Sequence, residues 1–212
     1  MNTIWFFGDS ITKGTGVLYG DEMYDSNKKI FARILGEKLG YNVKNFGVSG
    51  ACNEWIVSSL LKQSQYFKKG DIVVACNTGS WGYIQFLKKK NKVITVNDVW
   101  IDDNDDWFNS QEEKDILMNY RAVRKKYHLE YYKFFKEQYK SIEDLLISKD
   151  IHMVVWDFYE WWDNPDKYER ITAASKGKVR DQHFSYKGHE SMANHILGLM
   201  YDKFPFLKKP LN

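Results

Sequence analysis

The sequence predicts an α/β protein in which helices cover both faces of a mostly parallel sheet. Short apolar runs at residues 3–7, 72–75 and 151–156 have the length of buried strands, and residues 41–46 predict another, the second in chain order. Segments with apolar residues at helical spacing separate these strands. Such an alternation is typical of parallel sheets, because two parallel strands need a long crossover connection between them.

The first half of the chain shows this alternation most clearly. Residues 26–39 predict a helix that Ser26 caps, and residues 53–67 predict a second helix. A Gly-Asp turn at residues 70–71 then leads into the third strand.

The middle of the chain departs from this rhythm. Residues 97–113 carry seven acidic residues and no basic one, together with Trp100 and Trp107. Linkers rarely hold so many aromatic residues, so this segment predicts an insertion over the edge of the sheet. Apolar residues from Leu117 to Leu145 then keep helical spacing for about eight turns, which predicts one long helix with a solvated basic face.

The last part of the chain is expected to hold a strand, a loop and a helix. The fourth strand at residues 151–156 is followed by a turn signal in residues 160–165 and by a helix over residues 185–204. No internal repeat, low-complexity tract or domain boundary interrupts residues 1–212, so we expect a single domain.

The composition narrows the class of protein. The net charge is +3, from 31 basic and 28 acidic residues, so neither a nucleic acid nor a membrane is expected as partner. No apolar run approaches the ~20 residues that span a bilayer. The apolar start lacks a basic head and runs directly into Gly8, so no signal peptide is expected, and the protein is predicted to be cytoplasmic or part of a larger assembly. Cys52 and Cys76 are expected to be free thiols.

A serine stands at the end of the first strand, in Gly8-Asp9-Ser10. Ligands of open parallel sheets bind beyond the carboxyl ends of the strands, and a serine there can be a nucleophile if a base reaches its hydroxyl. A serine that only caps a turn is the alternative. The residues that follow do not make a phosphate-binding loop, because Lys13 precedes Gly14, whereas that loop needs Gly-Lys-Ser or Gly-Lys-Thr.

Polar residues also follow other predicted elements. Residues 45–50 hold two glycines, which let the backbone approach a ligand closely or simply form a tight turn. Asn77 comes after the third strand, and its amide can donate a hydrogen bond to an oxyanion or cap a helix. Asp181 stands two residues before His183 and can orient the imidazole toward a nucleophile, although such pairs also bind metals.

Taken together, these segments resemble the SGNH (GDSL-like) hydrolases. Gly8-Asp9-Ser10 resembles the first sequence block of that family, and residues 45–50 resemble the second. Asn77 matches the asparagine of the third block, and Asp181 with His183 matches the last. Ser185 and Gly188 stand at the usual offsets after that histidine. The four blocks occur in the family's order and span nearly the whole chain.

The resemblance implies both a fold and a reaction. The fold would be a three-layer α/β/α sandwich with a flavodoxin-like, mostly parallel sheet of five strands, four of which the sequence locates. Ser10 would be the nucleophile of a serine esterase, His183 its general base, and Asp181 the group that holds the imidazole tautomer. The N–H groups of Ser10 and Gly50 and the side chain of Asn77 would meet the oxyanion. No metal or cofactor is implied.

The chain departs from the family pattern in two blocks. The third is usually Gly-x-Asn-Asp and here reads Ala-Cys-Asn-Thr at residues 75–78. The last is usually Asp-x-x-His, whereas the Asp-x-His of Asp181 and His183 resembles acetyl-handling members of the wider clan. His189 and His152 are the other candidates for a base, but the first falls in the final helix and the second in a buried strand, where we expect a core histidine.

The expected substrate is an ester of a small acyl group, such as acetyl, on a carbohydrate. Trp100, Trp107, Trp161 and Trp162 would supply flat surfaces for sugar rings, or would instead pack against the long helix. Lipid esters and thioesters are the enzymatic alternatives. A carbohydrate-binding module that keeps the fold without catalysis is the alternative from another class, and the altered third block favours it.

Overall fold

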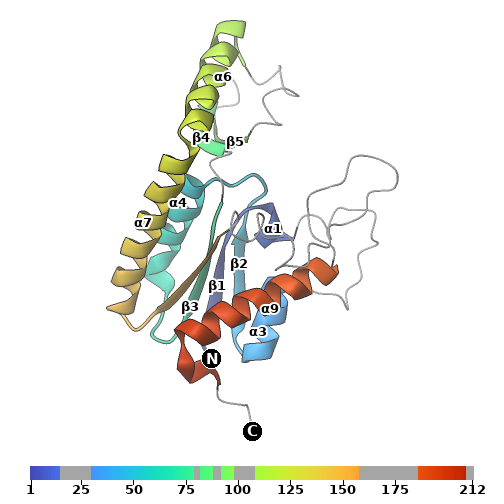
Figure 1. Cartoon of the computed structure of the whole chain (residues 1–212), viewed down its shortest axis with the longest axis vertical. Coiled ribbons are helices and arrows are strands. Elements are labelled where there is room, and N and C mark those ends of the chain that lie inside the picture. Colours follow the sequence, from blue (N-terminus) through green and yellow to red (C-terminus); the bar gives the residue numbers. More distant parts are fainter. Residues whose placement is uncertain (15–29, 79–81, 88–91, 98–107, 158–185, 209–212) are drawn as a thin grey trace.

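The computed structural model describes residues 1–14, 30–78, 82–87, 92–97, 108–157 and 186–208 (Figure 1). Four parallel strands form the main sheet in the order β2-β1-β3-β6. These strands are β1 (Thr3–Gly8), β2 (Asn42–Gly47), β3 (Ile72–Asn77) and β6 (His152–Asp157). They are the four strands that the sequence predicts, and the described residues contain no fifth strand of this sheet.

Helices cover both faces of the sheet. One face packs on α3 (Phe31–Leu39) and α9 (Tyr186–Lys203), and the other on α4 (Asn53–Gln63) and α7 (His128–Ile147). Side chains alternate along a strand, so Ile4 of β1 lies in the first layer and Trp5 in the second. This arrangement confirms the predicted three-layer α/β/α sandwich with a parallel sheet.

Three short helices complete the described core. They are α1 (Ser10–Lys13), η1 (Ser64–Tyr66) and η3 (Pro205–Lys208). The predicted start of the first long helix is wrong: α3 begins at Phe31, and Ile30 is its N-cap in an extended conformation. Ser26 lies outside the described residues.

The segment between β3 and α7 differs most from expectation. A two-stranded antiparallel sheet of β4 (Gly82–Leu87) and β5 (Lys92–Asn97) stands where the sequence predicted no element. The single long helix is in fact two helices, α6 (Gln111–Lys126) and α7, which meet at Tyr127. Figure 1 shows that α6 reaches well beyond the main sheet.

The acidic insertion is only partly described. Residues 98–107, which include Trp100 and Trp107, lie outside the described residues. Its end belongs to α6, where the Ser110 hydroxyl accepts a hydrogen bond from the Glu113 N–H and caps the helix. Acidic residues in a first turn are favourable next to the positive end of the helix dipole. Glu112 and Glu113 therefore stabilise a helix start.

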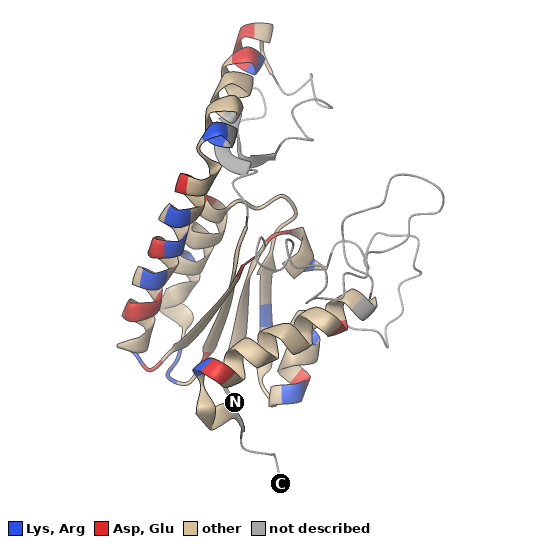
Figure 2. Cartoon of the chain, viewed as in Figure 1, with Lys and Arg blue, Asp and Glu red and all other residues tan. Residues whose placement is uncertain are grey.

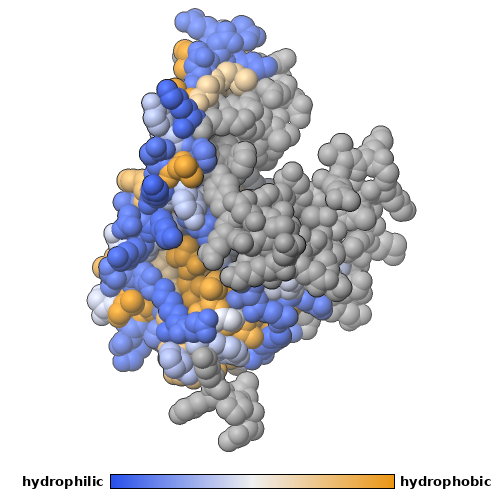
Figure 3. Space-filling model, viewed as in Figure 1, coloured by the Kyte–Doolittle hydropathy of each residue, from blue (hydrophilic) through white to orange (hydrophobic). Residues whose placement is uncertain are grey.

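The outer surface of the helices is polar and mixed in charge. Figure 2 shows both basic and acidic residues on α7. Figure 3 shows hydrophilic residues over most of the described helical surface, with apolar residues between them in a few places. In the described part of the chain, no helix has the length and apolar character needed to cross a membrane.

Candidate active site

Ser10 lies where β1 passes into α1. The Asp9 carboxylate accepts hydrogen bonds from the N–H groups of Ile11, at 3.0 Å, and Thr12, at 3.4 Å. Asp9 is therefore the N-cap of this short helix. Gly8 has no room for a side chain, because a Cβ there would lie 2.7 Å from Thr12 Cβ. The Gly-Asp-Ser sequence thus makes a tight strand-to-helix turn that leaves Ser10 half-buried at the carboxyl end of the sheet.

The turn after β2 packs directly against this one. Gly47 is level with Gly8 in the parallel register, and the Val48 N–H donates to the Gly8 carbonyl at 3.0 Å. The Asn45 side chain donates to the Thr12 carbonyl at 2.7 Å. Gly50 follows with a φ of +73°, a conformation that favours glycine. These contacts fix the turn that carries Gly50 beside α1.

Asn77 is the last residue of β3 and only 1% exposed. Its Oδ1 accepts a hydrogen bond from Asn53 Nδ2 at 3.0 Å, and its Nδ2 donates to Asp157 Oδ2 at 3.4 Å. Parallel strands bring their carboxyl ends to one edge, so Asn77 lies at the same edge as Ser10 and the turn of Gly50.

The remaining predicted site residues fall outside the described part of the chain. They are Asp181, His183, Trp161 and Trp162, besides the two tryptophans of the insertion.

Three residues at this edge escaped the sequence analysis. Asn53 is 3% exposed at the start of α4. The Tyr139 hydroxyl of α7 has one hydrogen to share between two acceptors, the Cys76 carbonyl at 3.0 Å and Asn53 Oδ1 at 3.3 Å. Asp157 ends β6 as Asn77 ends β3, so the rule that singled out Asn77 would also have found it. The sequence does not single out Asn53 or Tyr139, because each lies in a segment whose pattern predicts an ordinary helix.

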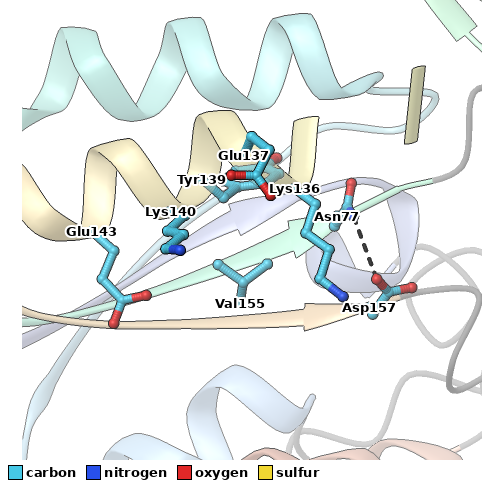
Figure 4. Close-up of a pocket in the computed structure, with 8 residues that line it drawn as sticks. All are labelled: Asn77, Lys136, Glu137, Tyr139, Lys140, Glu143, Val155 and Asp157. Atoms are coloured by element: carbon cyan, nitrogen blue, oxygen red, sulfur yellow. Dashed lines mark hydrogen bonds between the residues drawn. The ribbon is translucent and has the colours of Figure 1, made fainter. Parts of the chain in front are cut away.

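A cavity of about 360 Å³ opens beside Asn77 and Asp157, between β6 and α7 (Figure 4). All but one of its eight lining residues carry a polar or charged group. The residues are Asn77, Lys136, Glu137, Tyr139, Lys140, Glu143, Val155 and Asp157. The Tyr132 hydroxyl donates to Asp157, which ties the rim of the cavity to α7.

The other nucleophiles and bases considered from the sequence are accounted for by packing. Cys52 and Cys76 are free and buried, as predicted, and burial raises the pKa of the Cys52 thiol to about 12, so it stays protonated. The prediction of a core histidine at residue 152 is wrong: His152 is only half-buried, because it begins β6 at the opposite end of the strands from Ser10, and its ring lies 5.0 Å from that of Phe204. His189 is buried in α9.

The family of the chain follows from its sequence. A family model described as GDSL-like Lipase/Acylhydrolase matches residues 4–118, more than half of the chain. The chain belongs to the GDSL-like lipase/acylhydrolase family. The matched region of this GDSL-like chain includes Ser10, Gly50 and Asn77. Members of the family are typically serine esterases, so ester substrates are implied.

Solved structures of similar architecture include other GDSL-like proteins. A member of the G-D-S-L family from Veillonella parvula is 15% identical, covers 94% of this chain and 98% of its own, and gives a TM-score of 0.42. A lipase/acylhydrolase from Enterococcus faecalis is 16% identical, and the match covers 96% of this chain and 97% of that protein, with a TM-score of 0.40. An acetyl xylan esterase from Butyrivibrio proteoclasticus is 12% identical, and the match covers 96% of this chain and 64% of that protein, with a TM-score of 0.48. No curated protein matches the sequence.

Proposed function

We propose that this GDSL-like protein is a serine ester hydrolase with Ser10 as its nucleophile. The observation that carries the proposal is the meeting of Ser10, the Gly50 turn and Asn77 at one edge of the parallel sheet. Ligands bind at this edge of open α/β sheets. His183 serves as general base, and Asp181 holds its imidazole in the correct tautomer.

The reaction proceeds through an acyl-enzyme. Ser10 Oγ attacks the ester carbonyl while His183 accepts the hydroxyl proton, and the resulting oxyanion is met by the N–H groups of Ser10 and Gly50 and by the Asn77 amide. The bond to the alcohol oxygen then breaks, and His183 gives its proton to the departing alcohol. Water repeats the sequence on the acyl-enzyme and restores Ser10.

The substrate we propose is a small acyl ester, such as an acetyl group on a carbohydrate. Charged and polar groups in the lining of the cavity beside Asn77 support a hydroxylated substrate, because carboxylates and ammonium groups hydrogen-bond to hydroxyls. Trp100, Trp107, Trp161 and Trp162 are the proposed stacking surfaces for sugar rings.

A non-catalytic carbohydrate-binding module is the second candidate. Two features favour it: Thr78 replaces the family's usual aspartate, and the Asn77 amide already donates to Asp157. Such a module would bind acetylated sugars without hydrolysing any ester.

The decisive experiment measures hydrolysis of an aryl acetate, a long-chain aryl ester and acetylated sugars by the wild-type protein and by Ser10→Ala. Loss of a triad nucleophile costs about 10⁶-fold in turnover, so Ser10→Ala is expected to be inactive. Ser64 lies directly after α4, and its hydroxyl donates to the Leu61 carbonyl in the last turn of that helix, so Ser64→Ala is the matched control with wild-type rates. Ser10→Ala turnover within tenfold of wild type eliminates this nucleophile, and sugar binding by an inert wild-type protein establishes the binding module.

A further inference from the structure

The Asn77 amide is held by a second buried asparagine from a different element. Asn53 Nδ2 donates to Asn77 Oδ1 at 3.0 Å, although the two residues are 24 positions apart in sequence. Both side chains are almost completely buried, at 3% and 1% exposed. An asparagine can place either its oxygen or its nitrogen on a given side with little change of shape. Its partners therefore decide which end faces the reaction.

Backbone groups decide the orientation of Asn53. The Thr78 N–H donates to Asn53 Oδ1 at 2.9 Å, and Asn53 Nδ2 donates to the Thr78 carbonyl at 2.7 Å. A backbone N–H can only donate and a carbonyl can only accept, so these two bonds leave Asn53 a single amide orientation. The Tyr139 hydroxyl of α7 also lies 3.3 Å from the same Oδ1 and shares its one hydrogen between that oxygen and the nearer Cys76 carbonyl at 3.0 Å.

That orientation is passed on to Asn77. Because Asn53 presents an N–H to it, Asn77 must present its oxygen to Asn53 and its nitrogen to the other side. One hydrogen of that nitrogen reaches Asp157 through a long bond of 3.4 Å, and Nδ2 carries a second hydrogen. The orientation depends on the backbone of Thr78, so the loss of the family's usual aspartate at that position does not remove it.

We propose that Asn53 is a positioning residue that keeps the Asn77 amide turned with its N–H toward the developing oxyanion. This inference rests on the proposed function. Asn53 does not touch the substrate; it acts through Asn77. Its effect should therefore be confined to the transition state, with kcat lowered and KM unchanged.

Asn53→Asp tests the orientation itself. The carboxylate can still accept from the Thr78 N–H and from Tyr139, but it can donate neither to Asn77 Oδ1 nor to the Thr78 carbonyl. The Asn77 amide should then rotate to donate toward the carboxylate, which turns its oxygen toward the oxyanion. We expect kcat for an aryl acetate to fall by at least the roughly 10²- to 10³-fold typical of a lost oxyanion donor, and KM to stay within about threefold.

A double-mutant cycle separates positioning from general destabilisation. Asn53→Ala and Asn77→Ala are each expected to lower kcat, and the double variant should be no slower than Asn77→Ala, because no amide remains to be oriented. This cycle also stands on its own if Asn53→Asp fails to fold.

The matched control is Asp71→Asn, which makes the opposite change, from carboxylate to amide, at another buried side chain with several hydrogen bonds. Asp71 is 2% exposed and accepts hydrogen bonds from the Thr3 N–H at 2.9 Å, Trp5 Nε1 at 2.9 Å and the Lys68 N–H at 3.0 Å. It precedes β3, on the order of 20 Å from Asn77 at the strand rise of ~3.3 Å per residue. Asp71→Asn should lower the urea midpoint of unfolding while kcat stays at the wild-type value.

The outcomes distinguish this inference from the function beneath it. Equal kcat for the double variant and Asn77→Ala, with a slow Asn53→Asp, supports positioning by Asn53. A fast Asn53→Asp beside a slow Asn77→Ala, or additive losses in the cycle, overturns the role of Asn53 and leaves the esterase intact. An unchanged Asn77→Ala rate removes the oxyanion role and the inference with it, whereas an active Ser10→Ala refutes the proposed nucleophile.

Discussion

Gly47→Ala should damage catalysis by pushing the strand-to-helix turn of Ser10 out of place. Gly47 ends β2 and has no side chain where the backbone of α1 passes over it. A Cβ on Gly47 would lie 2.8 Å from Lys13 Cα and 2.8 Å from the Thr12 carbonyl carbon. Both are backbone atoms, so no side-chain rotation can relieve the contact.

The size of the effect follows from these distances. Ordinary van der Waals contact begins at 3.4 Å, and the Lys13 backbone nitrogen would lie closer still than these two carbons, so α1 or β2 must shift by more than roughly 0.6 Å. Overpacking of this kind typically costs about 1–3 kcal/mol of stability. A displacement of about 1 Å at reacting groups can cost about 10²-fold in rate, so a shift of this size is expected to lower kcat by at least about tenfold.

The assay is the kcat for an aryl acetate together with the urea midpoint. Gly40→Ala is the matched control: Gly40 has a φ of +68° and no atom within 4 Å of the place where a methyl group would stand, so that variant carries backbone strain of about 1 kcal/mol without moving its neighbours. It should lose stability and keep its kcat. Equal kcat in the two variants would show that the contact between β2 and α1 does not position Ser10.

Three further outcomes are expected. Activity should rise with pH as His183 loses its proton, and Asp181→Asn should lower both the rate and the midpoint, because the carboxylate favours the charged imidazole; an unchanged pH–rate profile would leave a Ser–His dyad. Burial lowers the pKa of His152, so the unfolded chain binds its proton more tightly, and stability should fall as pH drops from about 6.5 through the folded pKa. His152→Phe should flatten that part of a urea-midpoint curve, and an unaltered slope would contradict it. Arg124→Met should cost about 3 kcal/mol in urea unfolding, because it leaves Glu54 without the partner it holds at 2.6 Å; a loss below 1 kcal/mol would show that Glu54 is well solvated.

The strands and their polar ends were predictable because both signals are local. A buried strand needs a run of apolar residues, and β1 and β3 supply one each. Ser10 stands two residues after β1, and Asn77 is the last residue of β3. Because the carboxyl ends of parallel strands share one edge of the sheet, this placement alone brings the two residues to the same edge. Asp157 obeys the same rule at the end of β6.

The elements between β3 and α7 were not predictable from periodicity. Apolar spacing continues through Tyr127, so the pattern does not reveal the break between α6 and α7, where the backbone of Tyr127 has a φ of −109° and a ψ of 28°. Among the described strands, β4 and β5 pair with each other and not with the main sheet. The alternation of strands and helices that predicts the main sheet therefore does not predict them. Helix α3 likewise begins at Phe31 because Ile30 is extended, although the apolar spacing already includes Ile30.

The sequence by itself determined the layered fold, the family and the residue types that stand at the strand ends. Only the tertiary structure decided which way the Asn77 amide faces, and that it is held between Asn53 and Asp157. The physical reason is that an amide has a donor and an acceptor of nearly equal shape, so its orientation is set by its partners. Those partners come from α4 and β6, and they reach Asn77 only after helix and strand have packed against β3.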